Sequence, residues 1–192
     1  MARRGPSESY ALGEGDINSL WRACQELDDK ALVGLLLFEG MRVSEATHLK
    51  ADWVRQGEIH IPTKMECSCW TCSDRGYFQP KSKASARVIP IVETLLPHLL
   101  TFLQYKPGGL GYSRIYAWKR IKYLGEQAGV SYVTPHTLRA TFATSLAKSG
   151  ASAVTICYLL GWASLIIGQH YINIAKAKEE GTALMRRMFI SA

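Results

Sequence analysis

The sequence predicts a mainly α fold with a small antiparallel β-sheet, an α+β class, on three observations. Strand-like patterns occur only between residues 58 and 91, and helical patterns lie on both sides of them. The 192 residues, 47% hydrophobic and 20% charged, suffice for one domain with a buried core. The sequence holds no repeat or low-complexity tract, so we expect one domain over residues 12–192 behind a flexible N-terminal arm, residues 1–11.

Three helices are predicted before the sheet. The first has Asp16 as its N-cap, runs to about residue 27 and carries one apolar face. The second, residues 30–39, follows a cap at Asp28 or Asp29 and is apolar nearly all round, which predicts burial. Gly40 fits the end of this helix, and a short third helix covers residues 44–49.

The sheet is predicted from three short segments, and the first of them alternates polar and apolar side chains. A cysteine-containing hairpin insert, residues 65–76, follows the first strand, and a lysine-rich turn precedes the last. Helices then follow, with Thr134 and Pro135 marking one start and Gly150 and Gly161 marking two ends. The predicted strands are 58–61, 77–79 and 87–91, and the later helices are 93–104, 113–128, 135–148, 153–160 and 174–188.

The formal net charge of +7 and a pI near 9.2 favour a polyanionic partner, most often nucleic acid. Residues 149–175 contain no Lys, Arg, Asp or Glu, and this stretch is long enough to span a membrane. Polar side chains and glycines interrupt it, so a buried helix pair is the better interpretation and no membrane is expected. Five cysteines, an odd number, without an export signal indicate a reducing, cytoplasmic compartment.

Several dispersed side chains match what the binding of a phosphodiester requires. His136 and Arg139 lie three apart on the first turn of a predicted helix, beside the positive end of its dipole, where a phosphate would sit. Arg42 could bring a second guanidinium to the same anion. Each residue alone also has an ordinary structural interpretation, such as a surface ion pair of Arg42 with Glu45 or Glu39.

Four short motifs follow one another along the chain. They are Gly40-Met41-Arg42-Val43-Ser44-Glu45, His136-Thr137-Leu138-Arg139, Leu160-Gly161-Trp162 and His170-Tyr171. In this order and spacing they resemble the catalytic domain of the tyrosine recombinases, the family that includes phage integrases, over about residues 12–175. The resemblance implies the fold of that domain and a site-specific DNA recombinase, an integrase of a mobile element such as a virus or plasmid of an archaeal or bacterial host.

The resemblance also implies a role for each matching residue. The implied catalytic residues are Arg42, Lys81, His136, Arg139, Trp162 and Tyr171, with Glu45 and Lys83 in support. Tyr171 would attack phosphorus to form a 3′-phosphotyrosyl link while the two arginines bind the non-bridging oxygens. Lys81, or Lys83 in the same turn, would protonate the leaving 5′ oxygen. Two fixed cations make a catalytic metal unnecessary, so no cofactor is expected for the reaction.

Two other functions share part of this pattern. A type IB-like topoisomerase uses the same chemistry without strand exchange, and a catalytically silent DNA-binding regulator would need the cations alone. The regulator has no use for a nucleophile at this spacing, so the recombinase is favoured. Incubation with paired sites separates recombination from relaxation.

The resemblance implies double-stranded DNA as substrate and a homo-multimer, a tetramer, on that DNA. Family members usually carry a separate N-terminal DNA-clamping domain, so a removed domain, a one-sided grip or a partner protein is expected here. The apolar end of residues 174–192 suits docking on a neighbouring protomer, or folding back on its own core. The cations expected to contact DNA are Arg87, Arg114, Lys119, Arg120 and Lys122.

The hairpin insert contains three thiols within six residues. Their Cys-x-Cys-x-x-Cys spacing is typical of a structural zinc site, which needs a fourth ligand. His60, Asp74 or Cys24 could supply that ligand, and reduced or disulfide-linked cysteines are the alternative. The three candidate zinc ligands are Cys67, Cys69 and Cys72.

Overall fold

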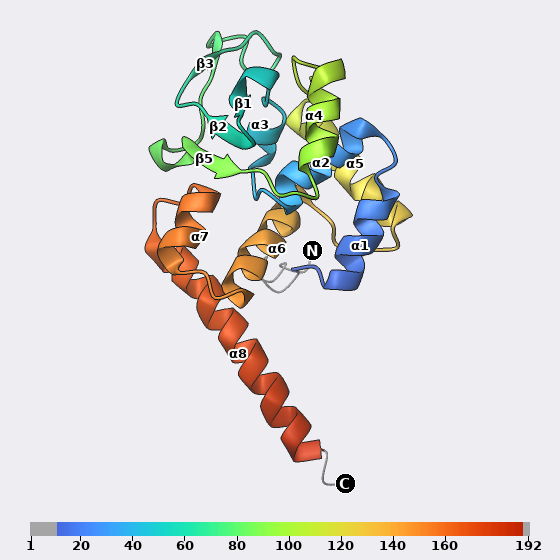
Figure 1. Ribbon diagram of the computed structural model, residues 1–192, viewed down its shortest axis with the longest axis vertical. Helices are drawn as coiled ribbons and strands as arrows, with labels where there is room; N and C mark the ends of the chain where they lie inside the picture. The colour runs from blue at the N-terminus through green and yellow to red at the C-terminus, as the bar shows by residue number, and fades with distance from the viewer. Residues whose placement is uncertain (1–10, 190–192) are drawn as a thin grey trace.

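The computed structural model describes residues 11–189 and is mainly helical, with two small antiparallel sheets (Figure 1). The predicted fold class is therefore confirmed. The predicted arm at residues 1–11 lies outside the described residues except for its last position. In chain order the elements are α1 (Glu14–Ala23), α2 (Leu27–Leu37), α3 (Val43–Ala46), η2 (Ala51–Trp53), β1 (Val54–Arg55), β2 (Glu58–Ile61), β3 (Met65–Glu66), β4 (Tyr77–Phe78), η3 (Lys83–Ser85), β5 (Arg87–Pro90), α4 (Leu96–Tyr105), α5 (Arg114–Gln127), α6 (Pro135–Lys148), α7 (Ala153–Leu160) and α8 (Leu165–Phe189).

The larger sheet has the strand order β1-β2-β5, with both pairs antiparallel. Ile59 on β2 lies opposite Val54 on one side and Ile89 on the other, and Ile59 and Ile89 are both buried. The strands β3 and β4 pair with each other to form a separate hairpin between β2 and β5 in sequence. The cysteine insert therefore belongs to an extension of the molecule beyond the larger sheet.

Helix α2 lies at the centre of the main core and packs against α4 and α6. Its residues from Ala31 to Leu37 are all buried, as the apolar sequence predicts. Gly34 permits the close approach of α4, because a Cβ at this position would lie 2.4 Å from Leu95 Cδ1. A second apolar cluster joins α6, α7 and the first turns of α8.

Helices α6 and α7, which bear or border part of the predicted site, have strong local signals and match their predicted bounds. Thr134 accepts the Thr137 backbone N–H in a capping box, and Pro135 occupies the first turn of α6. Helix α7 ends at Gly161, whose φ of +61° is the left-handed conformation that glycine adopts at low energy. The sequence therefore predicts both ends of α6 and α7.

Other boundaries were predicted wrongly. Gly13 and Glu26 are the N-caps of α1 and α2, in place of Asp16 and of Asp28 or Asp29. Asp28 and Asp29 instead pair with side chains from the α4–α5 connection and from α5, so tertiary contacts use them. The strands β1 and β3 were not predicted, because a strand of two residues is too short to show an alternation of polar and apolar side chains.

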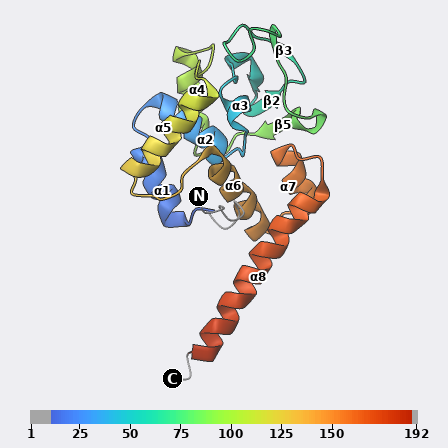
Figure 2. The same ribbon diagram turned by 180° about the vertical axis from the view of Figure 1, so that it is seen from behind.

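Helix α8 begins at Leu165, well before the predicted 174, and so includes Tyr171. Its second half extends away from the rest of the protein as one straight helix (Figures 1 and 2). Between residues 11 and 189, no single helix has the length and apolar content to cross a membrane. Helices α7 and α8 have that length and apolar content only when taken together, and the pair is bent by 118°.

Candidate active site

Arg42 stands at the N-cap of α3 and is held there by the helix that it begins. Glu45 accepts both the Arg42 backbone N–H, at 2.9 Å, and the guanidinium Nη1, also at 2.9 Å. The guanidinium also donates to Ser85 Oγ and to the Gly161 carbonyl, each at 2.8 Å. These bonds fix the Arg42 side chain in one orientation while leaving it partly exposed.

Arg139 projects from the second turn of α6 into the junction between α2 and α7. Its guanidinium donates to the carbonyls of Gly40 and Leu160, which lie at or beside the ends of those helices. Gly40 and Gly161 both have a positive φ, and a Cβ on either would collide with neighbouring atoms at 2.3 Å and 2.8 Å. Each glycine thus turns a helix-end carbonyl toward one of the two arginines.

The buried charges around Arg42 do not balance. Arg42, Arg87 and Arg139 surround a single buried carboxylate, that of Glu45. Burial alone would raise the pKa of Glu45, but the charge of Arg87 and hydrogen bonds from both neighbouring arginines hold it below its usual value. Burial, and then the like charge of Arg42, lower the pKa of Arg139 to about 9. The guanidinium remains charged at neutral pH, and an anion beside it would relieve this repulsion.

A cleft of about 780 Å³ has Arg42 and Arg139 in its lining. Its lining comes from α3, the β3–β4 hairpin, the lysine-rich turn, the starts of α5 and α6, the α7–α8 turn and the start of α8. His136 and Lys81 are both exposed in this cleft, whereas Lys83 is absent from its lining and lies in η3. Five of the predicted catalytic residues therefore line one cleft, namely Arg42, Lys81, His136, Arg139 and Trp162.

The sixth residue, Tyr171, lies beside the cleft in α8. Its ring stacks on Trp162 with centroids 5.3 Å apart, and Trp162 in turn lies 5.6 Å from the Arg139 guanidinium carbon. Tyr171 is only 4% exposed, in the apolar cluster of α6, α7 and α8. The structure thus brings Tyr171 next to the two-arginine centre within one chain, with its ring buried behind the tryptophan.

The structure corrects one of the predicted DNA-contacting cations, Arg87, and pairs a second, Arg120, with a carboxylate. The Arg87 side chain is 1% exposed and donates to Glu45, to the Ser85 carbonyl and to the Leu159 carbonyl, so it cannot reach DNA. Arg120 donates from Nε and Nη2 to the two oxygens of Asp29, each at 2.7 Å. Both arginines have buried carboxylate partners far away in sequence, and a basic sequence pattern does not reveal such partners.

The remaining predicted DNA contacts lie on the surface. Arg114, Lys119 and Lys122 are exposed on α5. Arg114 lines the active-site cleft and also an adjoining cleft with Trp70 and Trp118. Residues that sequence reasoning missed also line the active-site cleft, among them Arg75 in the hairpin insert. Arg75 is an isolated arginine in a cysteine-rich insert, and nothing in the sequence around it predicts that it lines this cleft.

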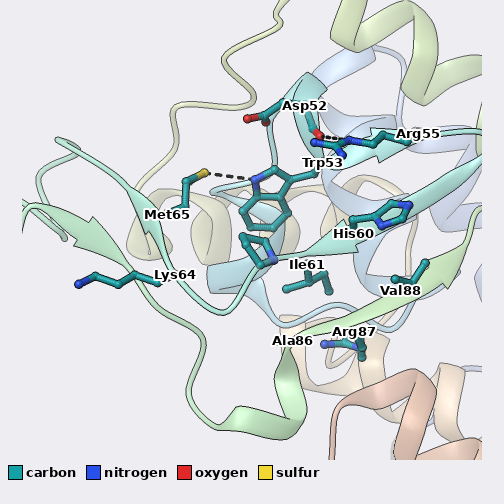
Figure 3. Close-up of a pocket in the computed structure, with 11 residues that line it drawn as sticks. Asp52, Trp53, Arg55, His60, Ile61, Lys64, Met65, Ala86, Arg87 and Val88 are labelled. Carbon is teal, nitrogen blue, oxygen red and sulfur yellow. Dashed lines mark hydrogen bonds between the residues drawn. The ribbon is translucent and has the colours of Figure 1, made fainter.

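The predicted fourth metal ligands are not beside the cysteines. His60 lies on β2 in a different cleft, shown in Figure 3 with Trp53 and Arg55, and its Nε2 is 3.6 Å from Glu58. The ligand atoms of Cys67, Cys69 and Cys72 instead gather with that of His48. Neither Asp74 nor Cys24 belongs to this group, so the structure corrects all three proposed fourth ligands. His48 follows α3, 19 residues before Cys67, and no local pattern links the two.

The model of the phage integrase family matches residues 11–178. Tyrosine recombinase XerD of Neisseria meningitidis serogroup B is 31% identical over 166 residues, which are 81% of this chain and 53% of that protein. The chain thus spans about half the length of the curated relatives that it matches.

Two solved structures share the fold. A XerA recombinase superposes with a TM-score of 0.72 at 23% identity and covers 95% of this chain and 66% of its own. The Tn1549 transposon integrase in complex with a circular intermediate DNA superposes with a TM-score of 0.67 at 19% identity, covering 90% and 65%. At these identities the likeness establishes the fold, and the predicted recombinase fold is confirmed.

Proposed function

The chain belongs to the phage integrase family, and from that premise we propose that it is a site-specific DNA recombinase that works through a phosphotyrosyl intermediate. The observation that carries the proposal is the shared cleft of two arginines, a histidine, a lysine and a tryptophan, with Tyr171 stacked on the tryptophan. The excess of buried guanidinium groups over carboxylates favours an anion there. A DNA phosphodiester supplies one.

Arg42 and Arg139 bind the non-bridging oxygens of the scissile phosphate in this proposal. Their carbonyl and carboxylate partners hold both guanidiniums before DNA arrives, so little reorganisation is needed as negative charge develops. The Trp162 indole N–H adds a donor to the same oxygens. Such preorganised donors are typically worth about 3–4 kcal/mol each. Glu45 acts as a positioning residue, because it contacts Arg42 and Arg87.

The reaction is an in-line displacement at phosphorus. The Tyr171 phenolate oxygen forms a bond to phosphorus as the bond to the 5′ oxygen breaks. His136 accepts the phenolic proton, and Lys81 donates a proton to the departing 5′ oxygen. A second 5′-hydroxyl then attacks the phosphotyrosyl link and releases the tyrosine. No bond energy is lost between the two steps, so ATP is not required, and the fixed charges of Arg42 and Arg139 neutralise the transition state in place of a catalytic metal.

Tyr171 must leave its buried position before it can attack. It is packed behind Trp162, and the α8 residues that precede it, Leu165, Ile166 and Ile167, are exposed. We propose that DNA binding shifts this first part of α8 and turns the phenol toward the cleft. Cleavage therefore depends on an opened form of the start of α8.

Double-stranded DNA is the proposed partner. The similar Tn1549 integrase has been solved with DNA, and Arg114, Lys119 and Lys122 offer exposed cations on α5 for phosphates. We propose that the protein acts on this DNA in the cytoplasm of a prokaryotic host. It would act there as part of a mobile element. A tetramer, in which two pairs of protomers hold two sites, is the proposed exchanging assembly.

A nicked suicide substrate tests the chemistry. Cleavage beside a nick releases a short strand that cannot rejoin, so wild-type protein should accumulate as a covalent DNA adduct in a denaturing gel. Tyr171→Phe should form no adduct. Tyr158→Phe is the matched control, because Tyr158 is an exposed tyrosine on the neighbouring α7, and it should form the adduct normally. An adduct with Tyr171→Phe would refute the assignment of the nucleophile.

Paired substrates test the outcome of the reaction. Recombinant products from two sites, dependent on Tyr171, support recombination. Relaxation of supercoiled DNA without recombinant products would restrict the activity to that of a topoisomerase. DNA binding with no adduct on any nicked substrate would leave only a regulatory role.

A further inference from the structure

Four metal-binding side chains converge from two segments of the chain. His48 follows α3, and Cys67, Cys69 and Cys72 lie in the β3–β4 hairpin, with all four ligand atoms within 4.8 Å of one another. The His48 Nε2 atom is 3.3 Å from Cys69 Sγ and 3.4 Å from Cys72 Sγ. In a tetrahedral zinc site with three thiolates and one imidazole, neighbouring ligand atoms lie about 3.6–3.8 Å apart. The observed spacing is close to that geometry.

The histidine is already oriented as a ligand. Its Nδ1 atom lies 2.6 Å from the Ser44 carbonyl oxygen, which can only accept, so Nδ1 carries the proton and donates it. The lone pair is therefore on Nε2, the atom that faces the sulfurs. The ring also stacks on Phe78, with centroids 4.3 Å apart and the planes at 23°. A backbone carbonyl that fixes the tautomer is the usual outer-shell partner of a metal-bound histidine.

Apart from these four side chains, the β3–β4 hairpin has few buried residues that could stabilise it. Between residues 66 and 76 only Cys72 is buried, and Trp70 is 91% exposed. The strands β3 and β4 have two residues each, and short isolated hairpins are marginal in water. Small segments without their own core commonly depend on a metal or a disulfide. All three cysteines are free thiols in the structure.

We infer that His48, Cys67, Cys69 and Cys72 form a structural zinc site that joins the β3–β4 hairpin to the segment after α3. Three thiolates and an imidazole favour zinc, and four protein ligands leave no open position for catalysis. The hairpin also contributes Thr71 and Arg75 to the active-site cleft. The metal thus fixes one side of that cleft relative to the Arg42 helix.

Zinc content tests the site directly. The full chain, prepared with zinc present and then desalted, should hold one equivalent by elemental analysis. His48→Ala and Cys69→Ser should each lose the metal, and Cys69 is exposed, so its replacement leaves the apolar core intact. The matched controls, His60→Ala and Cys157→Ser, should retain it. Zinc-free wild type, or loss of zinc in His60→Ala but not in His48→Ala, would overturn the inference.

Two further measurements separate a metal site from a disulfide. A chelator should lower the melting temperature of the wild type and leave that of Cys69→Ser unchanged. After chelation and denaturation without reductant, all five cysteines should react with a thiol reagent, whereas one disulfide would leave three. None of these assays uses DNA, so the zinc site and the recombinase proposal stand or fail separately.

Discussion

Glu45 and Glu39 are both buried carboxylates, but the charges around them differ. Glu45 lies between Arg42 and Arg87, which hold its pKa below the usual value despite burial. Glu39 accepts the Val92 backbone N–H at 2.9 Å, and burial raises its pKa to about 7. At the scale of the residue, an arginine pair thus keeps one carboxylate charged for the site, while the other ionises only near neutral pH.

Glu39 makes the stability of the fold depend on pH. Its pKa is about 7 when folded and 4.5 in the reference state, so the folded protein binds more protons between these values. The free energy of unfolding should therefore fall as pH rises from 4.5 through 7. Glu39→Gln keeps an acceptor for Val92 without a charge, so this variant should be the more stable protein at pH 8, by at most about 3 kcal/mol.

Urea unfolding at pH 5 and pH 8 checks this prediction. The difference between Glu39→Gln and wild type should be small at pH 5 and large at pH 8. Glu93→Gln alters a nearby exposed carboxylate and should show no such difference. An equal effect of Glu39→Gln at both pH values would contradict the assigned pKa.

At the scale of the element, α5 combines structural and surface cations. Ala117, Ile121 and Leu124 pack into the core, and Arg120 reaches from the edge of that face to the buried Asp29. Lys119 and Lys122 lie on the exposed face. A helical pattern separates the two faces, but a cation beside the boundary can belong to either. For Arg120, the contact with the distant Asp29 decides that its role is structural.

Replacement of these neighbouring cations should have opposite consequences. Arg120→Ala leaves the Asp29 carboxylate buried without its partner and, since Arg120 is partly exposed, should reduce the free energy of unfolding by about 2–3 kcal/mol. Lys119→Ala should change stability by less than about 0.5 kcal/mol. It should instead weaken DNA binding and reduce the slope of log affinity against log salt by about one.

Urea midpoints and DNA-binding titrations at several salt concentrations measure both effects. If Arg120→Ala left the free energy of unfolding unchanged and reduced the slope of log affinity against log salt, Arg120 would be a DNA-contacting residue and not a structural one. The same pair of assays on Lys122→Ala tests whether the exposed face extends along α5.

Local signals predicted the elements that have caps and turns of their own, and failed where distant contacts decide. Thr134, Pro135 and Gly161 set the ends of α6 and α7 through their own backbone preferences. The start of α8 was missed because Gly168 and its polar neighbours resemble a loop. In the structure Gly168 lies against α7, where a Cβ would be 2.8 Å from the Ala153 carbonyl oxygen. That contact, like the approach of His48 to the cysteines, exists only in the folded chain.

For the site, motif order indicated which residues gather, but not their burial. The sequence placed Arg42, His136 and Arg139 together because their motifs match a family, and the structure brings them to one cleft. It did not indicate that Arg87 is enclosed or that Tyr171 is packed behind Trp162. Burial depends on the full set of neighbours, and short motifs contain little information about it.

At the scale of the whole molecule, α8 carries both Tyr171 and an exposed apolar surface. Tyr171 and Ala175 pack against α6 and α7, whereas the side chains of 176–188 are almost all exposed. Leu184, Met185 and Met188 are among them, with exposures of 57%, 61% and 71%. An exposed apolar group on a projecting helix is a typical surface for association. The proposed nucleophile and this surface share one helix, so docking of the tail can influence Tyr171 directly.

Replacing Leu184, Met185 and Met188 together by serine should prevent assembly on DNA without unfolding the protein, because these side chains are exposed. Light scattering on a DNA site should give a multimer for the wild type and a single protomer on DNA for the triple variant. Lys176→Ser with Lys178→Ser changes exposed polar positions of the same helix and should assemble normally. Suicide-substrate cleavage and thermal melting of the triple variant report whether its own Tyr171 still acts and whether the domain is intact. Equal mass for wild type and triple variant would exclude this part of α8 as the contact between protomers, and the tetramer would then need another interface.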